Sequence, residues 1–179
     1  FEYPSVPEVK ENYSFSISQK ALRKMIKKTI FAVSQNEARK PILTGSLFEI
    51  ETGVLSVVST DGYRLAICKE TINSSLESKK FVIPGLTLRE VFKVLEDDEE
   101  KMVNIIVSDR HVMFNFENYK VVTRLLEGNF VNYKQIIPTE FITTVKVARN
   151  SLLFSLERAT VVAKEAKNLV KLDIKENYM

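Results

Sequence analysis

The chain has 179 residues, of which 45% are hydrophobic and 27% are charged, and its formal net charge is +3. This length is enough for one domain and part of another, and the composition excludes disordered and fibrous proteins. One cysteine is too few for an internal disulfide, and one cysteine with one histidine is too few for a zinc site; a lone cysteine fits a reducing cytosol. No apolar run of about 18 residues is present, so no segment is expected to span a bilayer.

The chain begins with a predicted linker, a strand and a helix. Two prolines and several acids favour an extended linker over 1–11. Apolar and polar residues alternate in Tyr13–Ile17, which predicts a strand with one buried face. Ser18 is a suitable cap for the helix that follows, which we expect to run to about Gln35. Its apolar residues have the spacing of one buried helical stripe, formed by Leu22, Met25, Ile26, Thr29, Ile30 and Val33.

Three strand-like runs follow the helix. They lie at Leu43–Glu51, Val54–Ser59 and Tyr63–Lys69, and turn residues separate them at Thr52-Gly53 and Asp61-Gly62. Because glycine tolerates a positive φ, Asp-Gly between two strands predicts a tight hairpin.

The same order of elements then begins again, about 66 residues further on. A strand is predicted at 81–83 and a helix with apolar residues from 88 to 95, and strands are predicted at 103–107, 112–116 and 120–126. Two such units give eight strands and two helices. They predict an α+β fold of two four-stranded sheets with both helices on one side, which buries the helical stripes.

A third copy of the unit starts after Pro138. Thr143–Val147 is predicted as a strand, a helix capped by Asn150 or Ser151 follows, and Leu169–Ile174 is the next predicted strand. We therefore expect a linker at 1–11, one complete domain at 12–139 and the incomplete start of another at 140–179.

A basic block in the first helix suggests a polyanion partner. From Tyr13 to Lys40 there are seven basic residues and one acid, so this stretch carries +6 and the rest of the chain −3. No acid lies at i+4 to offset the charges, and no aromatic residue interleaves on that face, which favours contact with the backbone of duplex DNA over base stacking. The alternatives are an ordinary solvated lysine face and, with less support, an anionic membrane surface. The candidate DNA-facing residues are Lys20, Arg23, Lys24, Lys27, Lys28, Arg39 and Lys40.

Asp61 offers an enzymatic alternative, a metal-dependent nucleotidyl-transfer or nuclease domain. Such a site needs two or more clustered carboxylates. The acidic run Glu96–Glu100 could supply them, but it follows a predicted helix and is typical of a solvated loop. A hairpin turn accounts for Asp61 and Gly62 and leaves Arg64 unexplained.

Five motifs in chain order resemble the bacterial DNA polymerase III beta subunit, the sliding-clamp family, and above all its central domain. They are Lys40–Gly45, Thr60–Ala66, Val82–Gly85, Arg124–Tyr133 and Ile136–Pro138. Leu156–Ala159 looks like the first helix of the third domain of that family.

The resemblance implies a clamp-fold fragment and a non-catalytic processivity factor of the replicative polymerase. In this family a homodimeric ring of full-length chains closes around duplex DNA, with helices lining the hole and sheets outside. The partners implied are the DNA polymerase III alpha subunit, the clamp loader and other clamp-binding peptides. No cofactor and no metal are implied, and the location is the bacterial cytoplasm.

The family also has a hydrophobic cleft that binds partner peptides. It often carries His where this chain has Tyr63 and Pro where this chain has Val131. The far wall of the cleft belongs to third-domain strands that we do not expect in 140–179. The alternative for Leu43, Leu65 and Ile136 is ordinary core packing. The matching positions here are Leu43, Thr60, Gly62, Tyr63, Arg64, Leu65, Val131 and Ile136.

Overall fold

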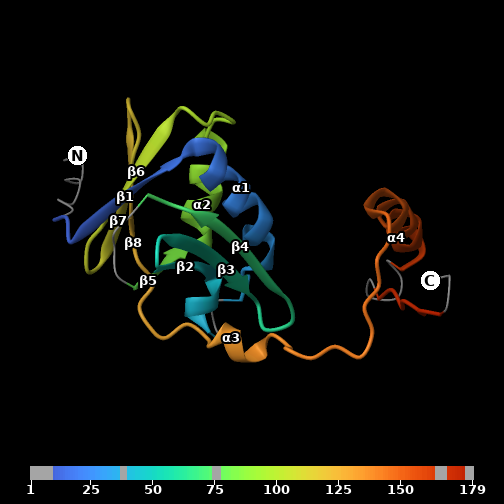
Figure 1. Cartoon of the computed structure of the whole chain (residues 1–179). Coiled ribbons are helices and arrows are strands. Elements are labelled where there is room, and N and C mark those ends of the chain that lie inside the picture. The colour runs from blue at the N-terminus through green and yellow to red at the C-terminus, as the bar shows by residue number, and fades with distance from the viewer. Residues whose placement is uncertain (1–9, 37–39, 74–77, 164–168, 176–179) are drawn as a thin grey trace. The chain divides into compact units, whose positions relative to one another are not determined.

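The computed structural model describes residues 10–36, 40–73, 78–163 and 169–175 (Figure 1). The chain divides into two compact units, Phe1–Lys134 and Gln135–Met179. Most of the predicted linker at 1–11 lies outside the described residues. In the described part of the chain, no helix is long and apolar enough to cross a membrane.

The first unit contains the two predicted repeats. The first repeat consists of β1 (Tyr13–Ser18), α1 (Gln19–Thr29), β2 (Gly45–Glu51), β3 (Val54–Thr60) and β4 (Leu65–Thr71). Two short 3-10 turns, η1 (Ile30–Ala32) and η2 (Pro41–Thr44), join α1 to β2. The second repeat consists of β5 (Lys79–Pro84), α2 (Gly85–Val94), β6 (Met102–Val107), β7 (His111–Asn115) and β8 (Lys120–Arg124).

The two repeats exchange their first strands. One antiparallel sheet has the order β1-β6-β7-β8, and the other has the order β4-β3-β2-β5. In the first sheet Phe15 pairs with Ile105, and in the second Phe48 pairs with Phe81. The prediction of two four-stranded sheets is confirmed, while the hydrophobic pattern did not specify this exchange.

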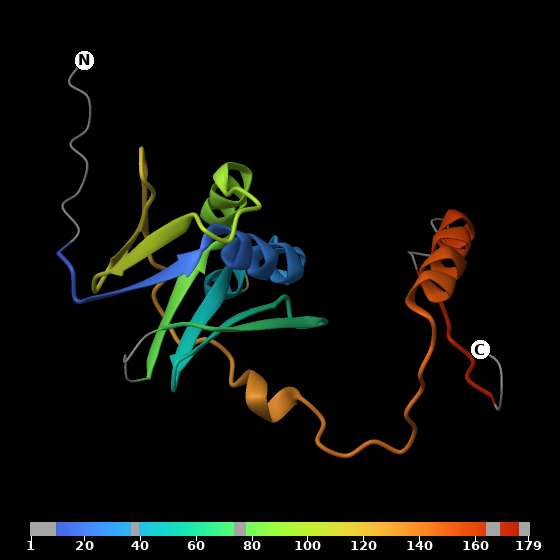
Figure 2. The same cartoon turned by 45° about the horizontal axis from the view of Figure 1, so that its top comes forward.

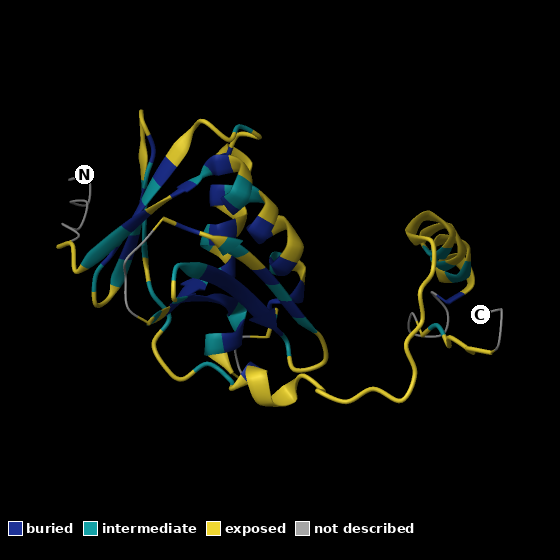
Figure 3. Cartoon of the chain, in the orientation of Figure 1, coloured by how far each residue is buried: buried dark blue, intermediate teal, exposed yellow. Residues whose placement is uncertain are grey.

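Both helices pack against the inner faces of the sheets and share one hydrophobic core (Figures 2 and 3). Ser18 caps α1 as predicted, because its Oγ accepts a hydrogen bond of 3.2 Å from the Ala21 backbone N–H. Burial of each large apolar side chain of the α1 stripe stabilises the fold by roughly 1.5–3 kcal/mol. The buried stripe of α1 comprises Leu22, Met25, Ile26 and Thr29.

The first helix ends earlier than predicted. It stops at Thr29, whose hydroxyl donates to the Met25 carbonyl oxygen at 2.8 Å, and η1 follows instead of a continued helix to Gln35. Val33 is extended, with φ −70° and ψ 145°, and it is buried beside Gly85 at the start of α2. Packing of Val33 against the second repeat therefore overrides the helical period that the sequence shows.

The Asp61-Gly62 hairpin is wider than predicted. Thr60 pairs with Leu65, so four residues form the loop, and Tyr63 and Arg64 lie in this loop and not in a strand. Gly62 has a φ of +93°, as its role in a turn requires. Likewise Leu43 belongs to η2, and β2 begins only at Gly45.

The second unit contains one long helix, α4 (Arg149–Ala163), and the short α3 (Tyr133–Ile136) spans the boundary between the units. The predictions of strands at Thr143–Val147 and Leu169–Ile174 are wrong, because neither segment is in a strand. A strand needs a neighbour for its backbone hydrogen bonds, and the described part of this unit supplies no sheet. The helix begins at Arg149, so Asn150 and Ser151 lie inside its first turn and are not its caps.

Candidate functional site

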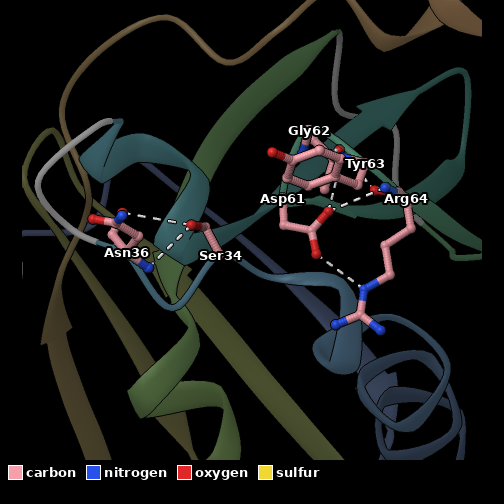
Figure 4. Close-up of polar contacts among 7 residues, drawn as sticks. Ser34, Asn36, Asp61, Gly62, Tyr63 and Arg64 are labelled. Carbon is pink, nitrogen blue, oxygen red and sulfur yellow. Dashed lines mark hydrogen bonds and ion pairs between the residues drawn. The ribbon is translucent and has the colours of Figure 1, made fainter. Parts of the chain in front are cut away.

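Asp61 organises the loop that joins β3 to β4 (Figure 4). Its Oδ1 accepts hydrogen bonds from the backbone N–H groups of Tyr63 and Arg64, at 2.9 and 3.0 Å. Its Oδ2 accepts from Nε of Arg64 at 3.0 Å. At the base of the loop, Thr60 Oγ1 donates to the Arg64 carbonyl oxygen and accepts from Gly62 N–H. The loop is thus held in one conformation by its own side chains.

These contacts occupy the Asp61 carboxylate. Burial acts to raise its pKa, but the two backbone donors and the Arg64 guanidinium outweigh burial and lower the pKa below the ordinary value. Among the described residues, no group of three or more His, Cys, Asp or Glu side chains could hold a metal ion. The hydrogen bonds of its carboxylate make Asp61 a structural residue of this turn.

Tyr63 and Arg64 project from this loop. Tyr63 is 94% exposed, although it is a large hydrophobic residue. The guanidinium of Arg64 lies 5.6 Å from the ring centre of Phe31 in η1, which is itself 56% exposed. Sequence reasoning missed Phe31. Its position outside the buried stripe of α1 was the available signal.

A small apolar cluster lies beside the loop, on the outer face of the sheet β4-β3-β2-β5; we call it the outer cluster. Leu65, one of the predicted cleft residues, is packed against it. The segment that follows β8 covers this face through Leu126, Phe130 and Tyr133. The buried members are Leu47, Val58, Val82 and Tyr133, and the partly buried members are Ile42, Leu65, Ile67, Leu126 and Phe130.

The structure brings most of the predicted cleft residues to this region. Thr60, Gly62, Tyr63, Arg64 and Leu65 are consecutive or nearly so around one loop. Leu43 follows the cluster member Ile42, but it is only 5% exposed and is thus mainly a core residue. Val131 is half-buried and lines a pocket with Leu47 and Val82. Ile136 is exposed and belongs to the second unit, so its place in the cleft stays a prediction.

A buried carboxylate lies in the same pocket. Glu49 on β2 is 2% exposed and accepts a hydrogen bond from the Tyr133 hydroxyl. Lys80 Nζ lies 2.7 Å from its Oε1, and Lys134 Nζ lies 3.4 Å from its Oε2. Burial acts to raise the pKa of Glu49, but these three partners together lower it. Burial first, and then the bond to Glu49, raise the pKa of Tyr133 to about 12.

The basic face of α1 is more compensated than its sequence indicates. Lys20 Nζ lies 3.1 Å from a carboxylate oxygen of Glu99, and Lys24 Nζ lies 2.9 Å from one of Glu70. Arg23 donates to the backbone carbonyl oxygens of Phe92 and Leu95 at 2.9 and 2.6 Å, and it stacks on the Phe92 ring. The expectation that no acid offsets the charges of this helix was wrong for Lys20 and Lys24, because Glu99 and Glu70 come from distant segments.

The charges of Lys27 and Lys28 on this face are not offset by a described acid. Both are exposed and, within the described ranges, have no ion-pair partner. Lys40 is also exposed, before η2, and has no ion pair with any described residue. Arg39 lies outside the described residues.

The sequence matches the model of the family "DNA polymerase III beta subunit, central domain" over residues 16–132. The chain is 40% identical to the beta sliding clamp of Halalkalibacterium halodurans over 172 residues and 36% identical to that of Bacillus subtilis over 176 residues. The alignments cover 94% and 97% of this chain, but only 45% and 46% of the relatives. The chain thus spans about half the length of the curated relatives it matches, and it belongs to the DNA polymerase III beta subunit family.

Solved structures agree with this assignment. The fold matches the Bacillus subtilis DNA polymerase sliding clamp with a TM-score of 0.86 and 34% identity, over 92% of this chain and 43% of that one. It matches the DNA polymerase III beta subunit of Thermotoga maritima with a TM-score of 0.84 and 30% identity, over 93% of this chain and 45% of that one. The α+β clamp-domain fold is therefore shared with known clamps.

Proposed function

We propose that this chain is part of a sliding clamp, the processivity factor that tethers a replicative DNA polymerase to its template. The proposal rests on membership of the beta subunit family and, within the fold, on the exposed Tyr63–Arg64 loop beside the outer cluster. An aromatic residue and an arginine beside an apolar surface are typical of sites that anchor a few side chains of a partner. The whole protein acts as a non-catalytic subunit and needs no cofactor.

The occupant of this site is a short extended peptide with Leu or Phe anchors. The DNA polymerase III alpha subunit and the clamp loader carry such segments in this proposal. Leu65 and Val131 form its apolar floor, and Arg64 lies at the rim. Thr60 and Gly62 shape the loop that presents Tyr63 to the peptide.

The second surface is for duplex DNA. Full-length chains form a homodimeric ring in the bacterial cytoplasm, and α1 faces the hole of the ring. Lys27 and Lys28 make most of the contacts with the phosphates from this chain, because their charges are not offset by described acids. Such contact is independent of sequence and falls steeply with salt.

A peptide titration tests the proposal. A short peptide with acidic residues followed by Leu and Phe is added to the 15N-labelled chain, and the amide signals of Tyr63, Arg64 and Leu65 are followed. We expect their chemical shifts to change, and we expect Leu65→Asp to remove the change while the chain stays folded. The cleft assignment fails if the perturbations lie elsewhere, or if folded Leu65→Asp binds equally well.

A further inference from the structure

We infer that Glu49 and Tyr133 are positioning residues for the partner site: their hydrogen bond fixes the segment that carries Val131 onto the outer face of the sheet. This inference rests on the proposed function. The buried polar cluster of Glu49, Lys80, Tyr133 and Lys134 makes no contact described above with the Asp61 turn or with the basic face of α1, so its role has to be explained separately.

The placement of Glu49 needs an explanation. It lies in the middle of β2, where it pairs with Ser56 on one side and with Lys80 on the other. A carboxylate that is 2% exposed loses most of its hydration, and this loss is tolerated only where charged or polar partners replace the water. Lys80 from the neighbouring strand offsets the charge, at 2.7 Å. One ion pair within the sheet would suffice for neutrality.

The other two partners come from outside the sheet. Tyr133 donates its hydroxyl hydrogen to Oε2 of Glu49, and Lys134 lies between Glu49 and Glu51, with its Nζ 2.8 Å from Oε2 of Glu51. Both residues belong to the segment after β8, about 84 positions along the chain from Glu49. The cluster thus joins β2 to a distant segment by one hydrogen bond and two ion pairs.

Anchoring this segment orders the partner site because Val131 is two residues before Tyr133. The Tyr133 N–H also donates to the Val131 carbonyl oxygen at 2.8 Å, so the two residues share one tight turn. The Tyr133 ring packs in the same outer cluster as Leu65. Loss of the anchor would therefore let Val131 move relative to Leu65 and leave the apolar floor incomplete before a peptide binds.

The experiment compares single-atom changes. Tyr133→Phe keeps the ring in the outer cluster and removes the donor, and Glu49→Gln keeps an oxygen acceptor for Tyr133. Tyr119→Phe is the matched control, because the Tyr119 hydroxyl donates to the Val94 carbonyl oxygen, far from the outer cluster. Each 179-residue chain is measured by hydrogen exchange and by titration with the same Leu/Phe peptide.

We expect Tyr133→Phe to speed amide exchange at 130–133 and to weaken peptide binding by at most about tenfold, because the lost hydrogen bond to a charged group acts on binding only through the fraction of chains whose segment leaves the sheet. For Glu49→Gln, the exchange rate at 130–133 and the peptide affinity should lie between those of Tyr133→Phe and those of the unsubstituted chain. Tyr119→Phe should change neither the exchange rate nor the affinity. A purely global effect on stability would instead raise exchange across both sheets. The inference is overturned if Tyr133→Phe binds peptide normally or if its exchange rises everywhere. If the unsubstituted chain binds no peptide, the proposed function fails and this inference fails with it.

Discussion

The Nζ of Lys24 lies 2.9 Å from Oε2 of Glu70, although the two residues are 46 positions apart in the sequence. The ion pair joins the middle of α1 to β4, and it shows that a basic stripe in a sequence is not the same as a basic surface. Arg23 and Lys20 make comparable contacts with the segment after α2. The free charge of the helix is concentrated toward its C-terminal end.

The first prediction concerns DNA. Changing Lys27 and Lys28 to Glu should weaken low-salt binding of duplex DNA far more than changing Lys20 and Lys24, whose charges are already paired. For each phosphate that a variant no longer neutralises, the slope of log K against log salt should become shallower by about 0.9. Fluorescence anisotropy over a range of salt concentrations measures both quantities. Equal losses in the two double variants would mean that the ion pairs open in the complex.

The second prediction concerns Tyr63. Because its side chain is 94% exposed, Tyr63→Ala should change the free energy of unfolding by less than about 0.5 kcal/mol. The same change should weaken binding of the Leu/Phe peptide, and calorimetry measures this loss. Met102→Ala is the control, because Met102 is also an exposed hydrophobic residue but lies on β6, and this change should not alter the affinity for the peptide. Unchanged affinity in Tyr63→Ala would remove the loop from the site.

The third prediction concerns pH. The pKa of Asp61 is lower in the folded chain than in the unfolded chain, so the unfolded chain binds its proton first as the pH falls. Stability from Asp61 is fully present above the unfolded pKa of about 3.9 and is lost as the pH falls through the lower folded value. Asp61→Asn should therefore lower the melting temperature at pH 7 and make it less sensitive to acid. Thermal melts of Asp61→Asn and of the unsubstituted chain over a range of pH check both effects, and equal acid sensitivity of the two would contradict the prediction.

The fourth prediction compares two glycines. A Cβ on Gly45 would lie 2.5 Å from the Ile83 carbonyl oxygen and 2.7 Å from Leu126 Cδ1, so Gly45→Ala must displace the backbone of β5. We expect a loss of about 1–3 kcal/mol, as for other overpacked sites. Gly62 has a φ of +93° but open space around it, so Gly62→Ala should cost about 1 kcal/mol from backbone strain alone. Chemical denaturation of both variants checks the order.

Local patterns predicted the elements of the first unit well. The alternation in Tyr13–Ile17, the stripe of α1 and the cap at Ser18 all agree with the structure, because each depends on residues a few positions apart. The repeat of strand, helix and three strands also agrees. The end of α1 did not follow its own period, because Val33 packs against the second repeat.

The site was harder to predict than the fold. The turn residues of the Asp61 loop were visible in the sequence, whereas the partners of Lys24 and Glu49 come from segments 46 and 84 residues away. No local period encodes such distances. The strand predicted at Thr143–Val147 also depended on a distant partner. Its residues alternate like those of a strand, but the described residues of the second unit contain no neighbouring strand with which it could pair.

The exchange of first strands between the repeats has a consequence for how the chain holds together. Neither repeat contains a complete sheet, since β1 completes the sheet of the second repeat and β5 completes that of the first. After a protease cut between β4 and β5, the two fragments should therefore stay associated through two antiparallel ladders, β1 with β6 and β2 with β5. Each fragment alone would expose an unpaired edge and half of the core. The first unit should thus unfold in a single cooperative step, and the two repeats, if produced separately, should regain structure only when they are mixed.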